Sequence, residues 1–171
     1  DKKRDDKEGI VFIMAGGKGK RLMPLTKNTP KTLLKISGKP ILGILLNSLE
    51  KQGFKKVYIS VNYLHKKIQK FIQNYKSELI IKIFKEKKPL GTAGSLYFLK
   101  KEKLKEPIIV INSDILTNFD LKKLIELHKK SKKAVSILSK NVSMQLPYGV
   151  IIKNLNNRFK KINEKPNMNF F

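Results

Sequence analysis

A glycine-rich segment followed by two cations is the part of this sequence best suited to chemistry. It spans residues 16–31 and directly follows a short apolar run at residues 10–14. Glycines let the backbone adopt positive φ and approach a ligand without an intervening Cβ, and the N–H groups freed in such a turn can bind an anion. We therefore expect a phosphate-binding turn with positive charge at its rim. The members of this segment are Gly16, Gly17, Gly19, Arg21 and Lys31.

This segment fits neither of the two common glycine motifs for nucleotides. A dinucleotide fingerprint, G-x-G-x-x-G, would need its third glycine where Leu22 stands, and a P-loop, G-x-x-x-x-G-K-[ST], would need its second where Arg21 stands. What is present is G-G-x-G-x-R-L-x-P-L-T at residues 16–26, followed by P-K-x-L-L at residues 30–34. A lone Gly-x-Gly would indicate only a β-turn, but a chance match to so long a pattern is improbable.

Strands and helices are predicted to alternate along the chain. Apolar runs predict strands at residues 10–14, 56–61, 79–84, 108–111 and 134–138, with later strands at residues 150–152 and 159–162. Helical spacing of apolar residues occurs at residues 41–49, 68–75, 92–101 and 121–128. This alternation predicts an α/β fold with a mixed, mainly parallel sheet and helices on both faces.

Such an architecture predicts where a ligand binds. Ligands of open α/β sheets lie beyond the carboxyl ends of the strands, so the glycine segment, residues 86–94 and residues 112–114 should converge on one edge. Asp114 follows a buried strand, where an isolated carboxylate needs a partner. Mg²⁺ commonly takes one or two carboxylates together with substrate phosphates. From the residues alone, Asp114 is a candidate metal ligand, and the alternative is a turn cap within Asn-Ser-Asp.

The composition is that of a small, strongly basic protein. Its 171 residues suffice for one domain with a core, and no apolar stretch reaches the roughly 18 residues of a membrane span. Lys and Arg number 38 against 13 Asp and Glu, for a net charge of +25. Because the excess is lysine spread along the chain, we expect no specific nucleic-acid binding but steering of anionic substrates. The chain has no cysteine, which excludes disulfides and cysteine metal sites; a cytoplasmic protein that binds no membrane is expected.

Taken together, the motifs resemble those of sugar-1-phosphate nucleotidyltransferases, also called NDP-sugar pyrophosphorylases, over residues 10–171. Residues 89–96, Pro-Leu-Gly-Thr-Ala-Gly-Ser-Leu, are similar to the P-L-G-T-A-G-A-L segment of the mannose-1-phosphate guanylyltransferase-like branch. The resemblance implies a Rossmann-like fold of the nucleotide-diphospho-sugar transferase type. It also implies transfer of a nucleotidyl group from an NTP, with GTP favoured, to a sugar 1-phosphate, with release of pyrophosphate and with Mg²⁺ as cofactor.

The resemblance further implies a role for each matching residue. Arg21 and Lys31 would be catalytic, holding the triphosphate and stabilising the leaving pyrophosphate, and Asp114 would bind the metal. The nucleotide-binding residues would be Ala15, Gly16, Gly17, Gly19, Glu86, Gly91 and Thr92. The residues that bind the sugar phosphate would be Tyr148, Gly149, Glu164 and Lys165. Positioning and charge neutralisation dominate this kind of transfer, so no covalent nucleophile is required.

Two positions leave alternatives open. Glu86 could select the base, because a carboxylate accepts both the N1–H and the amino group of guanine, whereas uracil or thymine suits an amide better. Alternatively, Glu86 is a solvated charge in the charged run at residues 85–88. Lys20 stands where the family usually has Ser or Thr. It could contact a phosphate, but we expect it to face solvent, as most lysines do.

The two ends of the chain bear on its domain organisation. Residues 1–8 are charged and lack hydrophobic periodicity, which is typical of a linker or tail, and such a leader allows an upstream regulatory domain. Residues 9–171 are expected to form the nucleotidyltransferase domain, with its nucleotide-binding part first. We expect this domain to be incomplete at its C-terminus, because the family has a second metal-binding aspartate downstream of the Glu-Lys-Pro motif. A chain of this length should therefore be poorly active. A homo-oligomer is a separate possibility that the sequence leaves open.

Two other functions stay open. Within the same fold, the chain could be a uridylyl-, thymidylyl- or cytidylyltransferase. From a different class, it could be a non-catalytic module that binds a nucleotide or another anion. Substitution of Arg21 or Lys31 separates the classes, because only an enzyme should lose more turnover than nucleotide affinity.

Overall fold

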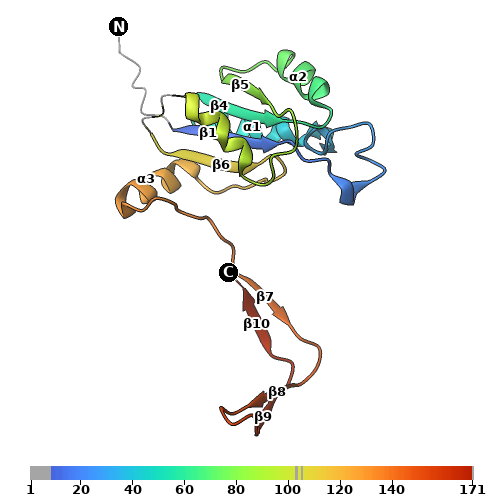
Figure 1. The fold of residues 1–171 in the computed structure, drawn as a ribbon, viewed down its shortest axis with the longest axis vertical. Coiled ribbons are helices and arrows are strands. Elements are labelled where there is room, and N and C mark those ends of the chain that lie inside the picture. Colours follow the sequence, from blue (N-terminus) through green and yellow to red (C-terminus); the bar gives the residue numbers. More distant parts are fainter. Residues whose placement is uncertain (1–8, 103, 105, 171) are drawn as a thin grey trace. The chain divides into compact units, whose positions relative to one another are not determined.

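The computed structural model describes residues 9–102, 104 and 106–170 (Figure 1). They form two compact units, with the division after Ala134. The predicted tail, residues 1–8, lies outside the described residues. None of the described helices combines the length and the apolar character needed to cross a bilayer.

The first unit consists of a parallel sheet and the helices around it. Its strands are β1 (Ile10–Ala15), β4 (Lys56–Val61), β5 (Ile80–Lys85) and β6 (Ile108–Asn112), with a short pair of β2 (Lys35–Ile36) and β3 (Lys39–Pro40). Its α-helices are α1 (Ile41–Lys51), α2 (His65–Gln73) and α3 (Leu121–Ser131), and its 3₁₀ helices are η1 (Lys20–Leu22), η2 (Lys31–Leu33) and η3 (Gly94–Lys101). The predicted alternation of strands and helices is confirmed for this unit.

The four long strands all run parallel, in the order β5-β4-β1-β6 (Figure 1). From β1 the chain moves outward to β4 and β5, and then returns to the opposite side of β1 as β6. Met14, near the end of β1, lies opposite Ser60 of β4 and Asn112 of β6. The carboxyl ends of the strands therefore share one edge, and the strand order reverses beside β1, which is where open α/β sheets bind their ligands.

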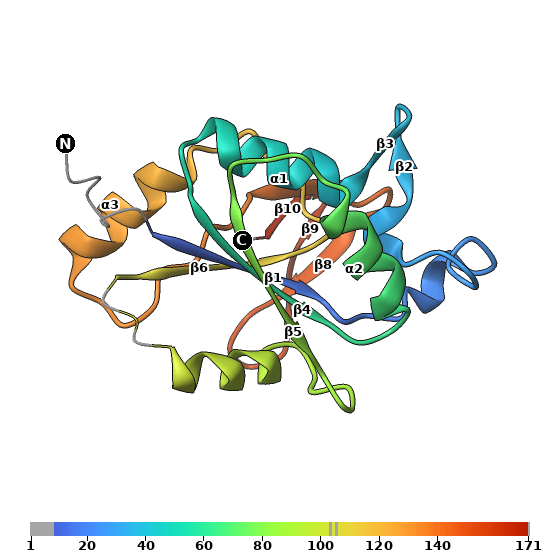
Figure 2. The same cartoon turned by 90° about the horizontal axis from the view of Figure 1, so that it is seen from above.

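Both faces of this sheet are covered, which explains why its central strand is continuously apolar. Val11 and Ile13 of β1 belong to a core shared with α1, α2 and α3, whereas Phe12 between them joins a second core with Tyr58 of β4 and Leu99 of η3. Figure 2 shows α1 and η3 on opposite sides of the sheet. The prediction of helices on both faces is confirmed.

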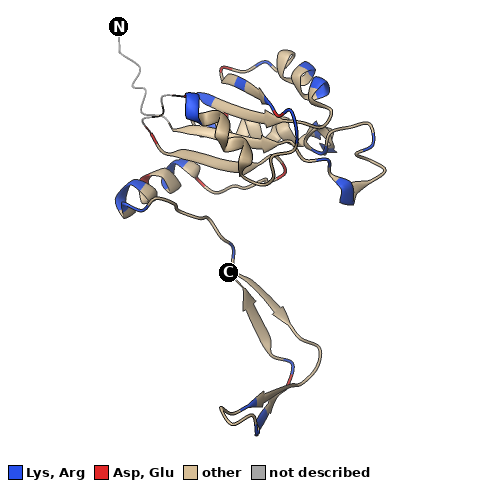
Figure 3. Cartoon of the chain, viewed as in Figure 1, with Lys and Arg blue, Asp and Glu red and all other residues tan. Residues whose placement is uncertain are grey.

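Basic residues are spread over separate elements of the first unit. Figure 3 shows Lys and Arg on η1, α2 and α3 alike. Of the two described arginines, Arg21 lies in the first unit and Arg158 in the second. The distribution agrees with the dispersed lysine excess of the sequence.

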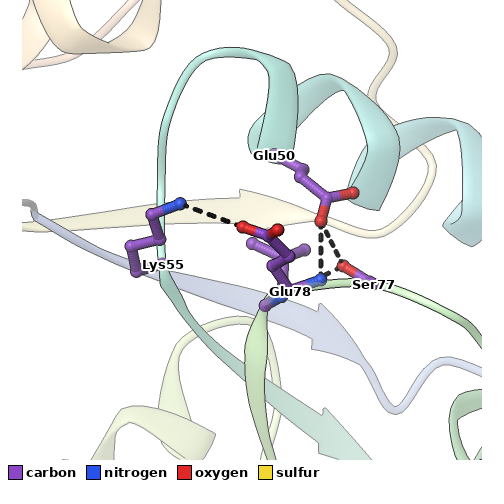
Figure 4. A network of polar contacts seen from close by, with 5 residues as sticks. Glu50, Lys55, Ser77 and Glu78 are labelled. Atoms are coloured by element: carbon purple, nitrogen blue, oxygen red, sulfur yellow. Dashed lines mark hydrogen bonds and ion pairs between the residues drawn. The ribbon is translucent and has the colours of Figure 1, made fainter.

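The last turn of α1 is tied to the start of β5 through Glu50 (Figure 4). Its Oε1 atom accepts hydrogen bonds from the Glu78 N–H at 2.7 Å and from the Ser77 hydroxyl at 2.8 Å. These two donors, with the Glu78 N–H the stronger, lower the pKa of the Glu50 carboxyl. Lys55 forms an ion pair with the Glu78 carboxylate at 3.6 Å. The network fixes the entry into an edge strand of the sheet.

The second unit consists of two antiparallel strand pairs. β7 (Val142–Gln145) pairs with β10 (Asn167–Phe170), and β8 (Val150–Lys153) pairs with β9 (Phe159–Asn163). The strands β8 and β9 confirm two predicted strands, and Asn154 holds the turn between them by accepting the N–H groups of Asn156 and Arg158 at 3.0 and 2.9 Å. β7 and β10 were not expected from the sequence.

Some predicted elements differ from the structure. The strand predicted at residues 134–138 is wrong: Val135 and Ile137 are 72% and 84% exposed, and no described strand pairs with this segment. An apolar run forms a strand only where a neighbouring strand can pair with its backbone N–H and C=O groups. The helix predicted at residues 92–101 is a 3₁₀ helix from Gly94. The main sheet is parallel throughout, and the antiparallel pairs form separate two-stranded sheets.

Candidate functional site

A cleft of about 570 Å³ opens at the carboxyl edge of the parallel sheet in the first unit. It is lined by the segments that follow β1, β5 and β6, as the sequence predicts for an α/β sheet. All the residues predicted for catalysis, nucleotide binding and metal binding line this cleft. They are Ala15, Gly16, Gly17, Gly19, Arg21, Lys31, Glu86, Gly91, Thr92 and Asp114.

The turn after β1 is held in shape around Gly19. This residue has φ +63°, and an added Cβ would lie 2.9 Å from Thr26 Cγ2. The Gly19 carbonyl accepts hydrogen bonds from the Thr26 hydroxyl and from the Leu22 N–H, both at 2.9 Å. Positive φ and close packing together explain why glycine is needed here. The turn leads directly into η1, which places Arg21 at the cleft.

Glu86 lies deep in the site rather than in solvent. It is only 7% exposed, so the alternative of a solvated charge is wrong. Its carboxylate accepts a hydrogen bond from the Leu90 N–H at 3.3 Å, and its Oε1 atom lies 2.8 Å from where a Cβ on Gly16 would stand. The missing side chain of Gly16 therefore makes room for this carboxylate, which can still accept further donors.

Lys31 and Asp114 form an ion pair across the cleft. Lys31 lies at the start of η2, and Asp114 follows β6 in a segment tied to β1 by the hydrogen bond from the Ser113 N–H to the Met14 carbonyl at 3.1 Å. The Lys31 Nζ atom donates to Asp114 Oδ2. Both side chains are about one-third exposed, at 38% and 35%, so the pair is open to the cleft and to water.

The segment after β5 completes the rim. Gly91 has φ +79°, and an added Cβ there would meet no atom within 4 Å, so its glycine serves the backbone conformation alone. Thr92 is exposed beside it. Lys20 is exposed, as expected, and it lines the same cleft near Arg21. Within the glycine-rich segment, Lys20 is thus a third cation at the cleft, beside Arg21 and Lys31.

Sequence reasoning missed several residues that position the site. The Asn62 side chain donates to the Glu86 carbonyl at 3.0 Å, and the Tyr63 hydroxyl donates to the Lys27 carbonyl at 2.7 Å. Lys67 of α2 donates to the Asn28 carbonyl in the same loop. Asn62 directly follows β4 at the carboxyl edge of the sheet, and this position in the sequence was the one signal that could have marked Asn62 as a site residue. Tyr63 and Lys67 carry no such signal.

The four residues predicted for the sugar phosphate belong to the second unit. An added Cβ on Gly149 would lie 2.8 Å from Glu164 Oε2, so these two are neighbours across the β8–β9 pair. Tyr148 is exposed, and Lys165 has φ +44° with its carbonyl accepting from the Gln145 side chain at 3.4 Å. Within this unit, the structure places Gly149 beside Glu164.

Comparison with known proteins identifies the family. Residues 10–170 match the family described as "Nucleotidyl transferase". The chain belongs to the nucleotidyl transferase family. It is 34% identical over 164 residues to mannose-1-phosphate guanylyltransferase 1 of Arabidopsis thaliana, covering 92% of this chain and 45% of that protein. It is 35% identical over 160 residues to the mannose-1-phosphate guanylyltransferase catalytic subunit beta of Drosophila melanogaster, covering 91% and 43%. The chain thus spans less than half the length of these relatives.

Two proteins of known structure share this fold. HddC from Yersinia pseudotuberculosis has a TM-score of 0.64 at 30% identity, covering 92% of this chain and 69% of that one. The same protein complexed with GMP-PN has a TM-score of 0.63 at 29% identity, with the same coverage. A UDP-glucose pyrophosphorylase has a TM-score of 0.61 at 18% identity, which supports the fold alone. The predicted family and fold class are confirmed.

Proposed function

We propose that this protein transfers a nucleotidyl group from GTP to a sugar 1-phosphate, forming an NDP-sugar and pyrophosphate. The observation that carries the proposal is the shared cleft, in which a glycine turn, three cations and two carboxylates meet at the switch point of a parallel sheet. The guanylyltransferase names of the relatives support the choice of reaction and of GTP.

The proposed reaction needs positioning and charge neutralisation rather than a covalent nucleophile. A phosphate oxygen of the sugar phosphate attacks the α-phosphorus of the nucleotide, and the bond to the bridging oxygen breaks as pyrophosphate leaves with the electron pair. Both reactants are anions, so their repulsion is part of the barrier. Backbone N–H groups of the glycine turn would hold the phosphates, while Arg21 and Lys31 would offset the charge that builds up on pyrophosphate.

A magnesium ion fits the chemistry of this cleft. Asp114 supplies the hard oxygen donor that Mg²⁺ prefers, and one or two carboxylates with substrate phosphates are its usual ligands in nucleotide enzymes. Across the described residues, no group of three or more His, Cys, Asp or Glu gathers to form a protein-only metal cage. We therefore propose that Asp114 holds Mg²⁺ beside the phosphates. When bound, the ion would neutralise phosphate charge and orient the triphosphate.

The proposed preference for GTP rests on Glu86. The carboxylate is buried at the cleft with acceptor capacity left over, and guanine offers two adjacent donors, N1–H and the amino group. A charged acceptor makes such hydrogen bonds stronger than a neutral one would. Uracil and thymine offer one N–H flanked by acceptors, which a carboxylate would repel. Gly91 and Thr92 would line the base or ribose on the same side.

For the second substrate, we propose that the second unit contributes the sugar contacts. Gly149 and Glu164 would approach the sugar hydroxyls, with Glu164 accepting their hydrogen bonds. Lys165 would contact the sugar phosphate, and Tyr148 would line the sugar.

A substrate panel tests the proposed reaction. The full chain is incubated with each of GTP, UTP, dTTP, CTP and ATP, combined with mannose 1-phosphate and other sugar 1-phosphates, and pyrophosphate release is measured. We expect release only when both substrates are present, and fastest with GTP. A clear preference for UTP or dTTP would overturn the assignment of Glu86. Nucleotide binding without any release for every pair, not even the slow release expected of a chain of this length, would favour the non-catalytic module.

A further inference from the structure

Two residues with different tasks in the proposed function are paired with each other in this structure. Lys31, which would contact phosphates, donates to the Oδ2 atom of Asp114, which would hold the metal. The pair joins η2 to the end of β6, and it lines the cleft. Lys31 therefore neutralises the carboxylate that the metal would need, and Asp114 neutralises the ammonium that a phosphate would need.

This pairing makes Asp114 a poor site for a free divalent ion. An ammonium on the carboxylate cancels its charge and repels an incoming cation. No third acidic or histidine ligand joins Asp114 from elsewhere in the described chain. We infer that Lys31 closes Asp114 to a divalent cation in the free protein, and that a nucleoside triphosphate opens this carboxylate by drawing Lys31 onto its phosphates; this inference rests on the proposed function.

The nucleotide supplies what opens the pair. Its phosphates, like the carboxylate, make charge-assisted hydrogen bonds with an ammonium, so Lys31 exchanges Asp114 for a phosphate. Asp114 is then free to accept the cation that accompanies the phosphates. Both charged side chains keep a partner throughout the exchange, so neither is left unpaired. Cation and nucleotide affinities must consequently be coupled, each raising the other by the same factor.

Binding of Mn²⁺ to the full chain without nucleotide tests the pair directly, with free Mn²⁺ followed by electron paramagnetic resonance. Wild-type protein should bind Mn²⁺ weakly, and Lys31→Met should bind it about tenfold more tightly, because a cation next to the carboxylate is gone. Lys20→Met is the matched control: Lys20 also lines the cleft but forms no ion pair with Asp114 among the described residues. Equal effects of the two substitutions, or no effect of Lys31→Met, would overturn the inference.

A second measurement uses nucleotide affinity rather than the metal alone. In EDTA, Asp114→Asn should bind GTP several-fold more tightly than wild type, because Lys31 is released; in Mg²⁺ it should bind more weakly. The gain in GTP affinity in EDTA should vanish in the Lys31→Met background, because the effects of substituting two residues of one ion pair are not additive. A gain that survives in that background would contradict the exchange. If wild type binds no GTP under any condition, the proposed function itself fails, while the Mn²⁺ result still reports on the pair.

Discussion

Gly16 and Glu86 show how one missing side chain shapes the site. Because an added Cβ on Gly16 would stand 2.8 Å from a carboxylate oxygen of the buried Glu86, the two positions constrain each other. Gly17 beside it is different, since an added Cβ there would meet no atom within 4 Å. Glycine is therefore needed at different positions of the motif for different physical reasons. Gly16 makes room for an acid, and Gly19 permits a left-handed turn.

Gly16→Ala should lower the stability of the fold. The new methyl must displace the end of the Glu86 side chain from its contact with the Leu90 N–H, and the loss of one such hydrogen bond costs about 0.5–1.5 kcal/mol. Thermal unfolding of Gly16→Ala, compared with Gly17→Ala, measures this. The first variant should melt at a lower temperature than wild type, and the second should not. Equal melting temperatures for both variants would show that Glu86 moves aside freely.

Glu86→Gln should weaken the preference for guanine. An amide offers one acceptor oxygen and no charge, so the paired donors of guanine lose a charge-assisted partner, worth roughly tenfold or more in affinity. The measurement is the ratio of GTP to UTP affinity. Glu126→Gln, an exposed glutamate on α3, is the matched control and should keep the wild-type ratio. An unchanged ratio in Glu86→Gln would remove the proposed role in base selection.

Among the elements, the strands that are buried between two layers of helices could be predicted from their apolar residues. The runs that became β1, β4, β5 and β6 are apolar because helices cover both faces of the sheet. Their parallel arrangement then predicts one ligand edge, where the glycine turn, Glu86 and Asp114 do meet. The segment at residues 134–138 has the same local pattern but no partner strand, and periodicity alone does not reveal that.

The connections between elements were less predictable than the elements. The Lys31–Asp114 pair and the burial of Glu86 depend on how loops from distant parts of the chain fold over the edge. Tyr63 and Lys67 anchor the loop between η1 and η2 through its backbone carbonyls. No pattern in the sequence points to a side chain whose partner is a carbonyl about 36 to 39 residues away.

Glu50 makes the link between α1 and β5 sensitive to pH. Hydrogen bonds from the Glu78 N–H and the Ser77 hydroxyl lower the pKa of this carboxyl below its ordinary value of 4.5. Its contribution to stability is therefore fully present above pH 4.5 and is lost as the pH falls through the lowered pKa. Glu50→Gln should destabilise the protein at pH 7, and the difference from wild type should shrink below pH 4.5.

Urea unfolding midpoints at a series of pH values check this expectation. Ser77→Ala removes the weaker of the two donors, so it should produce a smaller loss at pH 7 than Glu50→Gln. A difference between wild type and Glu50→Gln that stays constant from pH 7 to below pH 4.5 would contradict the role of the carboxylate charge.

At the scale of the whole molecule, excess positive charge and the site serve the same class of ligand. The net charge of +25 attracts anions to the protein from all sides, whereas Arg21, Lys20 and Lys31 concentrate cations at one cleft. Composition predicts the general attraction, but it does not say where an anion binds. The topology does, because the strand order reverses beside β1. Family membership then links this cleft to nucleotidyl transfer.

If the cleft after β1 stabilises a triphosphate during transfer, Arg21→Met should slow that transfer. Single-turnover rates and GTP affinities are measured for this variant and for Arg158→Met, the same change in the second unit. We predict that Arg21→Met lowers the rate about a hundredfold and affinity much less, because its charge acts mainly on the leaving pyrophosphate; Arg158→Met should match wild type in GTP affinity. Equal behaviour of the two variants, or a loss of affinity with an unchanged rate, would contradict this role of Arg21 and the cleft.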